Sequence, residues 1–183
     1  MAQHVAFLRA INVGGKGLVK MTDLQKAFAS AGCRNVGTFI ASGNVVFEAA
    51  NCDVVAKKLR TRLRRLLDPE PGVVFRTIPE MERLVKRAPF AKFAGERTWK
   101  FYVTFLAEKP AAKPRLPLVS DKEQLEVIEI RDRYALVVSR PIPGRRMYGF
   151  PNNFVEHELA VVATTRTWWT VTKVVEFARR SLQ

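Results

Sequence analysis

The sequence predicts an α+β protein made of two similar halves, and the order of its apolar segments is the main observation behind that prediction. Short apolar runs typical of buried strands alternate with longer segments whose apolar residues recur with the period of a helix. Residues 4–78 give the order strand, helix, strand, strand, helix, strand, and residues 79–183 loosely repeat it. We therefore expect two ferredoxin-like halves, 1–78 and 79–183, that arose by duplication, each an antiparallel sheet with helices on one face.

The first half begins with an apolar run at 4–11 that predicts a buried strand, and a helix follows after a loop. Thr22 and Gln25 have the spacing of a capping box, so we expect the helix to begin at Thr22. Gly32 is expected to follow its last turn, because glycine readily adopts the left-handed conformation found there.

A hairpin and a strongly basic helix complete this half. The hairpin strands are expected at 35–41 and 44–48, the helix at 52–67 and the last strand at 73–78. The helix has an apolar stripe, and its remaining surface is basic at Lys57, Lys58, Arg60, Arg62, Arg64 and Arg65. Such a surface is typical of a solvated amphipathic helix, and it also suits a ridge that follows the phosphates of a polyanion.

The helices and strands of the second half are predicted from the same patterns of apolar residues and turn residues. A helix is expected at 79–87, a strand at 99–106 and a hairpin with strands at 124–130 and 134–139. The proline- and arginine-containing loop at 140–153 is longer than a simple connection requires. A short segment then leads to the last helix of the chain.

A glycine-rich loop between the first strand and the first helix is the main candidate site. Backbone N–H groups at a helix N-terminus favour a phosphate or carboxylate, although the glycines also suit a turn that binds nothing. The loop fits neither a Walker A motif nor a dinucleotide-binding fingerprint. The anion-binding residues expected in this half are Arg9, Asn12, Gly14, Gly15, Lys16, Lys20, Ser42 and Asn44.

A second candidate lies before the last helix. Thr167 is expected to cap that helix, and Thr164, Thr165 and Arg166 are expected to form a turn that binds an oxyanion or only caps the helix. We expect this turn and the loop at 14–16 to converge on one pocket for a phosphate or carboxylate.

Composition sets limits on the other classes of function. The net charge of +14 attracts polyanions, but a solvated surface accounts for such a charge equally well. No apolar run reaches the roughly 18 residues of a membrane span. The N-terminal apolar run does not resemble a signal peptide, because Arg9 interrupts it and the small-residue cleavage pattern is missing. Cys33 and Cys52 are isolated and form no CxxC motif. We expect a cytoplasmic protein without a metal or cofactor, and no residue pattern indicates catalysis.

Four segments carry a resemblance to a known family. They are LRAINVGGKGLVKMTDL at 8–24, TFIASGNVVFE at 38–48, KFYVTFL at 100–106 and ATTRTWWTVTKV at 163–174. In these segments the chain resembles a bacterial family catalogued as domain-of-unknown-function family 1697. The resemblance implies duplicated ferredoxin-like halves and no particular activity. The chain departs from the family pattern at Ala10, where glycine is frequent, at Ala41, where glutamine is, and at Thr167 and Trp169, where asparagines are.

Two functional hypotheses follow from these residues. The first is an anion- or phosphate-binding protein whose basic surface binds nucleic acid. The first half has the strand order of an RNA-recognition motif but lacks its stacking aromatics around 43–47, so sequence-specific RNA reading is not expected. The alternative is a small enzyme that acts on a phosphorylated or carboxylated small molecule where Gly14–Lys16 meets Thr164–Arg166. A purely structural or interaction role is also left open.

Overall fold

The computed structural model describes residues 1–12, 18–67, 71–112 and 114–181. It contains two compact units, Met1–Arg83 together with Lys173–Gln183, and Leu84–Thr172. Two antiparallel sheets, of four and five strands, and five helices in the described residues confirm the predicted α+β class with two ferredoxin-like halves. The units are not two consecutive stretches of chain, because the C-terminal segment groups with the first unit.

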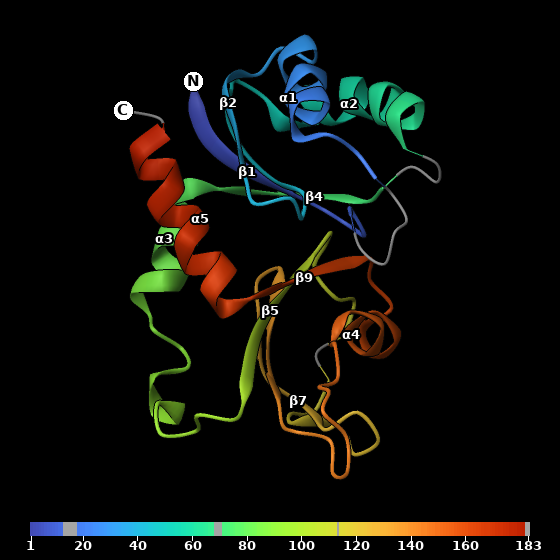
Figure 1. The fold of residues 1–183 in the computed structure, drawn as a ribbon, viewed down its shortest axis with the longest axis vertical. Helices are drawn as coiled ribbons and strands as arrows, with labels where there is room; N and C mark the ends of the chain where they lie inside the picture. Colours follow the sequence, from blue (N-terminus) through green and yellow to red (C-terminus); the bar gives the residue numbers. More distant parts are fainter. Residues whose placement is uncertain (13–17, 68–70, 113, 182–183) are drawn as a thin grey trace. The chain divides into compact units, whose positions relative to one another are not determined.

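The first unit is built on a sheet with the strand order β2-β3-β1-β4, and α1 and α2 lie together on one face of it (Figure 1). Every neighbouring pair of strands is antiparallel, as the β-α-β-β-α-β order requires. The elements are β1 (Ala2–Leu8), α1 (Met21–Ser30), β2 (Arg34–Phe39), β3 (Asn44–Ala49), α2 (Cys52–Leu66) and β4 (Val73–Thr77).

The core of this unit lies between the sheet and its two helices. Ala6 and Leu8 of β1 pack there with Phe47 of β3, and the ring of Phe28 from α1 lies 5.3 Å from the ring of Phe47. The alternate residues of β1 are also fully buried, Val5 among them. The central strand is therefore removed from water on both faces of the sheet.

The start of α1 differs from the prediction, while its end agrees with it. The helix begins at Met21, Lys20 is its N-cap residue, and no side chain caps it. The predicted Thr22–Gln25 capping box is wrong, because the amide of Gln25 donates to the hydroxyl of Thr38 at 3.2 Å. Gly32 follows the helix with φ of +100°, as expected.

Helix α2 has the predicted position and the predicted apolar stripe. Val55, Leu59 and Leu63 are buried, one turn apart along the helix. Asn51 caps the N-terminus, because its side-chain oxygen accepts from the N–H groups of the second and third residues of the helix. The buried stripe leaves the basic residues on the outward faces.

The end of α5 (Trp168–Ser181) packs against β2 and α3 (Ile78–Lys86) within the first unit. A side chain at Gly37 of β2 would meet the ring of Phe177 at 3.1 Å, so glycine allows the ring to lie close to the strand. The Phe177 ring also contacts that of Phe39, 5.7 Å away, and Arg179 donates to Glu82 of α3 at 2.8 Å. These contacts explain why the C-terminal segment groups with the first unit.

The second unit holds a sheet with the order β6-β7-β8-β5-β9. Between β5 (Lys100–Leu106) and β7 (Leu125–Arg131), the described residues contain the short strand β6 (Leu118–Ser120) and no helix that would correspond to α1. Helix α4 (Asn152–Leu159) lies in a segment for which the sequence predicted only a connection before the last helix. The elements are a 3-10 helix (Ala91–Phe93), β5 (Lys100–Leu106), β6 (Leu118–Ser120), β7 (Leu125–Arg131), β8 (Tyr134–Ser139), α4 (Asn152–Leu159), β9 (Ala163–Thr167) and α5 (Trp168–Ser181).

The two central strands carry the same pattern at the same register. Residues 4–8 read HVAFL in β1, and residues 102–106 read YVTFL in β5. Val5 lies opposite Arg76 of β4, and Val103 lies opposite Arg166 of β9. Both arginines are buried, and each is followed by a threonine and then a helix. The halves therefore repeat residue by residue at their centres.

The buried histidine of β1 gives the fold a pH dependence. Burial lowers the pKa of His4 below 6.5, against smaller opposing effects of a backbone hydrogen bond at Ala49 and of Glu80. Below pH 6.5 the unfolded chain therefore takes up a proton before the folded protein does, and the free energy of unfolding should fall as the pH falls. Chemical denaturation at several pH values measures this decline.

His4→Gln should flatten the decline, because the proton-binding group is gone. His157→Gln is the matched control, since His157 is exposed on α4 and should keep the wild-type decline. An equal decline in the wild type and in His4→Gln would contradict the assignment to His4.

Candidate functional site

Asn12 closes the base of the glycine-rich loop. Its side-chain oxygen accepts from the N–H of Val19 at 2.9 Å, and its side-chain nitrogen donates to the carbonyls of Val19 and Ala41 at 3.2 and 2.9 Å. Asn12 therefore holds the two ends of the loop together and ties them to the turn between β2 and β3. Its polar atoms are used within the protein, which indicates a positioning role.

Four other predicted residues lie at the same edge of the first sheet. Arg9 follows β1 and its N–H donates to the carbonyl of Gly72 at 2.8 Å, while Lys20 is exposed before α1. Asn44 is fully buried, and its side-chain nitrogen donates to the carbonyl of Phe39 and to the hydroxyl of Ser42. The fold thus brings Arg9, Asn12, Lys20, Ser42 and Asn44 to one edge, where the two asparagines organise the turns.

The backbone at this edge is strained. Ala10 and Ile40 have φ of 55° and 48°, a left-handed conformation that is uncommon for residues other than glycine and especially for a β-branched one. Gly14, Gly15 and Lys16 lie outside the described residues. Their predicted anion binding, and their convergence with Thr164–Arg166, stay predictions.

The predicted turn at Thr164, Thr165 and Arg166 is wrong, because these residues belong to strand β9 and are buried. The hydroxyl of Thr165 lies 2.9 Å from that of Thr104 and 3.2 Å from the side-chain oxygen of Asn152 at the start of α4. Thr165 therefore joins β5, β9 and α4. The helix begins one residue after Thr167, whose hydroxyl accepts from a backbone N–H of α5 at 3.2 Å, as the predicted cap requires.

Arg166 is held inside the second unit. Its guanidinium donates to the hydroxyl of Thr164 at 2.9 Å and to the carbonyl of Thr165 at 2.8 Å. Burial lowers the pKa of Arg166 to about 10. The group stays cationic at neutral pH, and these two hydrogen bonds lie within β9.

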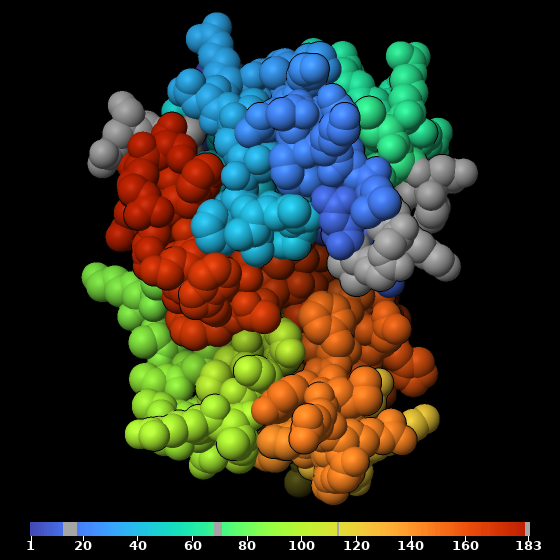
Figure 2. Space-filling model, in the orientation of Figure 1, coloured from blue at the N-terminus to red at the C-terminus, as the bar shows by residue number. Residues whose placement is uncertain are grey.

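The outward surface of α2 is the most basic surface that the structure describes on a single helix. Its side chains project from the first unit (Figure 2). Lys57, Lys58 and Arg65 are exposed and form no ion pair with a described residue, whereas Arg62 donates to the hydroxyl of Ser30 on α1 at 2.9 Å. The basic residues form two flanks, with Lys57, Arg60 and Arg64 on one and Lys58, Arg62 and Arg65 on the other.

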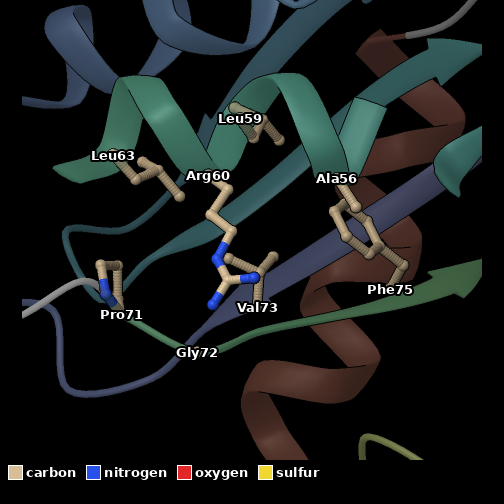
Figure 3. A pocket seen from close by; sticks show the side chains of 8 residues that line it. All are labelled: Ala56, Leu59, Arg60, Leu63, Pro71, Gly72, Val73 and Phe75. Carbon is tan, nitrogen blue, oxygen red and sulfur yellow. The ribbon is translucent and has the colours of Figure 1, made fainter. Parts of the chain in front are cut away.

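A small hollow lies between α2 and the start of β4. It has a volume of about 210 Å³ and is mainly apolar. Ala56 lies over the ring of Phe75, and Arg60 extends from the helix towards Gly72 and Val73 (Figure 3). The remaining lining residues are Leu59, Leu63 and Pro71. The sequence pattern did not predict this hollow, although the small residues Ala56 and Gly72 in its wall are a signal that space is left there.

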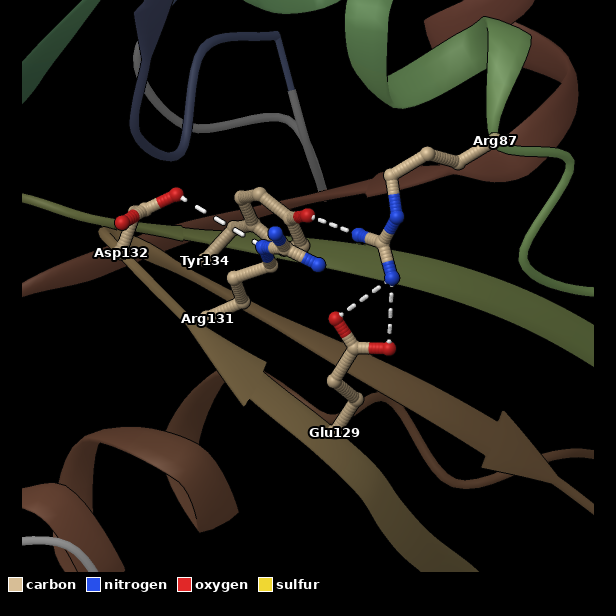
Figure 4. A network of polar contacts seen from close by, with 5 residues as sticks. All are labelled: Arg87, Glu129, Arg131, Asp132 and Tyr134. Carbon is tan, nitrogen blue, oxygen red and sulfur yellow. Dashed lines mark hydrogen bonds and ion pairs between the residues drawn. The ribbon is translucent and has the colours of Figure 1, made fainter.

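A polar network in the second unit was also not foreseen. The guanidinium of Arg87, just after α3, donates to both carboxylate oxygens of Glu129 at 2.8 and 2.9 Å and to the hydroxyl of Tyr134 (Figure 4). Arg131 and Asp132 form a wider pair beside it, at 4.0 Å. The network ties residue 87 to β7 and β8, and its groups already satisfy one another, so we assign it a structural role.

Metal and thiol chemistry find little support in the residues that the structure describes. No group of three His, Cys, Asp or Glu side chains is placed to hold a metal ion there. Cys33 and Cys52 are free thiols, and burial raises the pKa of each to about 11, so both stay protonated at neutral pH. Among the same residues, no helix has both the length and the apolar character needed to cross a membrane.

The role of Asn12 leads to a stability prediction. Asn12→Gly keeps a residue suited to positive φ but removes the hydrogen bonds, and should lower the free energy of unfolding by roughly 1–2 kcal/mol. Asn12→Ala should cost more, because alanine at φ of 54° adds backbone strain. Urea denaturation measures both. Unchanged stability in Asn12→Gly would show that the side chain does not hold the loop.

Comparison with known proteins places the chain in a family and identifies its fold. The model of the family described as "Protein of unknown function (DUF1697)" matches residues 1–135. The structure is similar to that of conserved bacterial protein SP0830 from Streptococcus pneumoniae, with a TM-score of 0.70, 16% sequence identity, and coverage of 97% of this chain and 98% of that one. A search of curated proteins found no match. At this identity the structural similarity supports the fold alone.

Proposed function

The chain belongs to the DUF1697 family, and we propose that it binds a polyanion, with nucleic acid as the principal class, through the basic surface of α2. The observation that carries the proposal is the set of exposed cations Lys57, Lys58 and Arg65, which have no acidic partner among the described residues. From Lys57 to Arg65 the helix rises about 12 Å, so these charges can contact several successive phosphates.

The stability of the helix alone does not account for these charges. Arg64 and Arg65 lie in the last turn, where cations interact favourably with the helix dipole. Farther from the C-terminus, Lys58 and Arg62 are like-charged neighbours four residues apart, and such a pair destabilises a helix by roughly 0.2–0.5 kcal/mol. An anion bound along the helix would remove this repulsion.

Nucleic acid suits this surface because its negative charges are regularly spaced and need no particular base sequence. Recognition on the open face of the sheet, as in RNA-recognition motifs, is not supported. Val5, Phe7 and Val46, which lie on the face opposite α1 and α2, are fully buried. The helix surface is therefore the better candidate for contact with a polyanion.

The test is binding of a labelled oligonucleotide at several salt concentrations, followed by fluorescence anisotropy. Lys57→Gln, Lys58→Gln and Arg65→Gln, combined in one protein, should weaken binding and reduce the slope of log affinity against log salt by about 2–3, since each lost phosphate contact contributes about 0.7–0.9. These side chains are exposed, so the unfolding transition should stay close to that of the wild type.

A matched control removes the same charge elsewhere. Arg97, Lys109 and Lys122 are exposed residues of the second unit, and their combined change to glutamine lowers the net charge equally. This control should keep nearly all of the wild-type salt slope. Equal losses in the two triple variants would show that binding follows net charge and would refute the assignment to α2.

A further inference from the structure

The hollow beside α2 and one flank of its basic residues lie on the same side of the helix. Arg60 lines the hollow, and Lys57 and Arg64 lie three residues before and four residues after it, so all three project in similar directions. A ligand whose phosphates contact Lys57 would therefore pass beside the apolar hollow. A double-stranded and a single-stranded nucleic acid differ in whether they can place an unpaired base in this hollow.

The size and the walls of the hollow suit a planar ring. An apolar cavity of about 150 Å³ is enough to bind a benzene-sized molecule, and this hollow has about 210 Å³. The ring of Phe75 forms part of its wall under Ala56, and Leu59 and Leu63 supply further apolar surface (Figure 3). The Phe75 ring is itself fixed, because it packs edge-on against the ring of Phe47 at 6.0 Å.

We infer that the polyanion bound by α2 is a single-stranded nucleic acid, one unpaired base of which enters the hollow while its phosphates run from Lys57 across the helix to Lys58 and Arg65. This inference rests on the proposed function and specifies its ligand. A single strand offers unstacked bases, which bind apolar and aromatic walls with little dependence on sequence. A duplex would first have to unstack and unpair a base, at a cost in affinity.

The experiment compares two single-stranded probes that differ only in their bases. One is a fluorescein-labelled oligothymidylate of about twelve nucleotides, within the usual site sizes for single strands. The other has the same length and phosphates but abasic residues throughout. The full chain should bind the thymidylate about tenfold more tightly, since one stacked base adds an increment of that order.

Filling the hollow should remove that preference. Ala56→Phe places a ring in the hollow, and the ratio of the two affinities should fall to about one. Ala56→Leu is a smaller filling change that should lower the ratio part of the way and serves if the larger side chain impairs folding, which thermal unfolding shows. Ala29→Phe is the matched control, because Ala29 is exposed on α1 in the same unit and should keep the ratio.

The outcomes separate this inference from the function on which it rests. Equal wild-type affinity for the two probes, or a preference that persists in both Ala56 variants, would overturn base insertion while binding by α2 stands. Tighter binding of a duplex of the same length would overturn it as well. Failure of the wild type to bind either probe would overturn the proposed function itself.

Discussion

The burial of the central strand of each sheet on both faces is the constraint on which the rest of the structure depends. In β1, residues Val5 to Leu8 are all fully buried, and in β5 the same is nearly true of Val103 to Leu106. A strand without a solvent-exposed face can carry almost only apolar residues or satisfied hydroxyls. Residues 5–8 are all apolar, and in residues 103–106 the hydroxyl of Thr104 lies 2.9 Å from that of Thr165. The neighbours of such a strand must then pair in a fixed register, because a shift of one residue would exchange its two faces.

This burial limits where a ligand can bind. The strands leave no open sheet surface at their centres, so accessible chemistry is confined to the helices and to the edges where the strands end. At the edge of the first sheet, Asn12 and Asn44 use their side chains to hold turns. On α2, by contrast, Lys57, Lys58 and Arg65 are exposed and form no ion pair with a described residue. The polar residues of β9 are likewise used inside the second unit, where Thr165 and Arg166 bond to their neighbours.

Sequence patterns predicted those helices and turns that are determined by residues close together in the chain. The position of α2, its buried stripe and its basic surface follow from helical periodicity, and the β2–β3 hairpin follows from the Ser42–Gly43 turn. Helix capping is a case in which a sequence pattern alone does not predict where a helix begins. Thr22–Gln25 matches the capping pattern but lies inside α1, whereas Thr77 and Glu80 form a real capping box before α3, with the Thr77 N–H donating to the Glu80 carboxylate at 2.7 Å.

Contacts between distant segments decided the remaining features. Strand β9 carries threonine and arginine at positions where buried strands usually carry apolar residues. These polar residues can be buried because Thr165 forms hydrogen bonds with Thr104 of β5 and Asn152 of α4. The match of HVAFL to YVTFL was a usable sequence signal that β1 and β5 are equivalent strands. The strand register then places Arg166 in β9 where Arg76 lies in β4. The hollow depends on how far α2 stands from β4, a distance that no single segment specifies.

The most direct test of the account is an amide NMR titration of the ¹⁵N-labelled full chain with the abasic single strand, which presents phosphates alone. If phosphates bind along α2, the largest shift changes will occur at residues 57–65 and will disappear when the salt concentration is raised. Shift changes concentrated in other segments, with the amides of α2 unaffected at saturation, would contradict binding along α2.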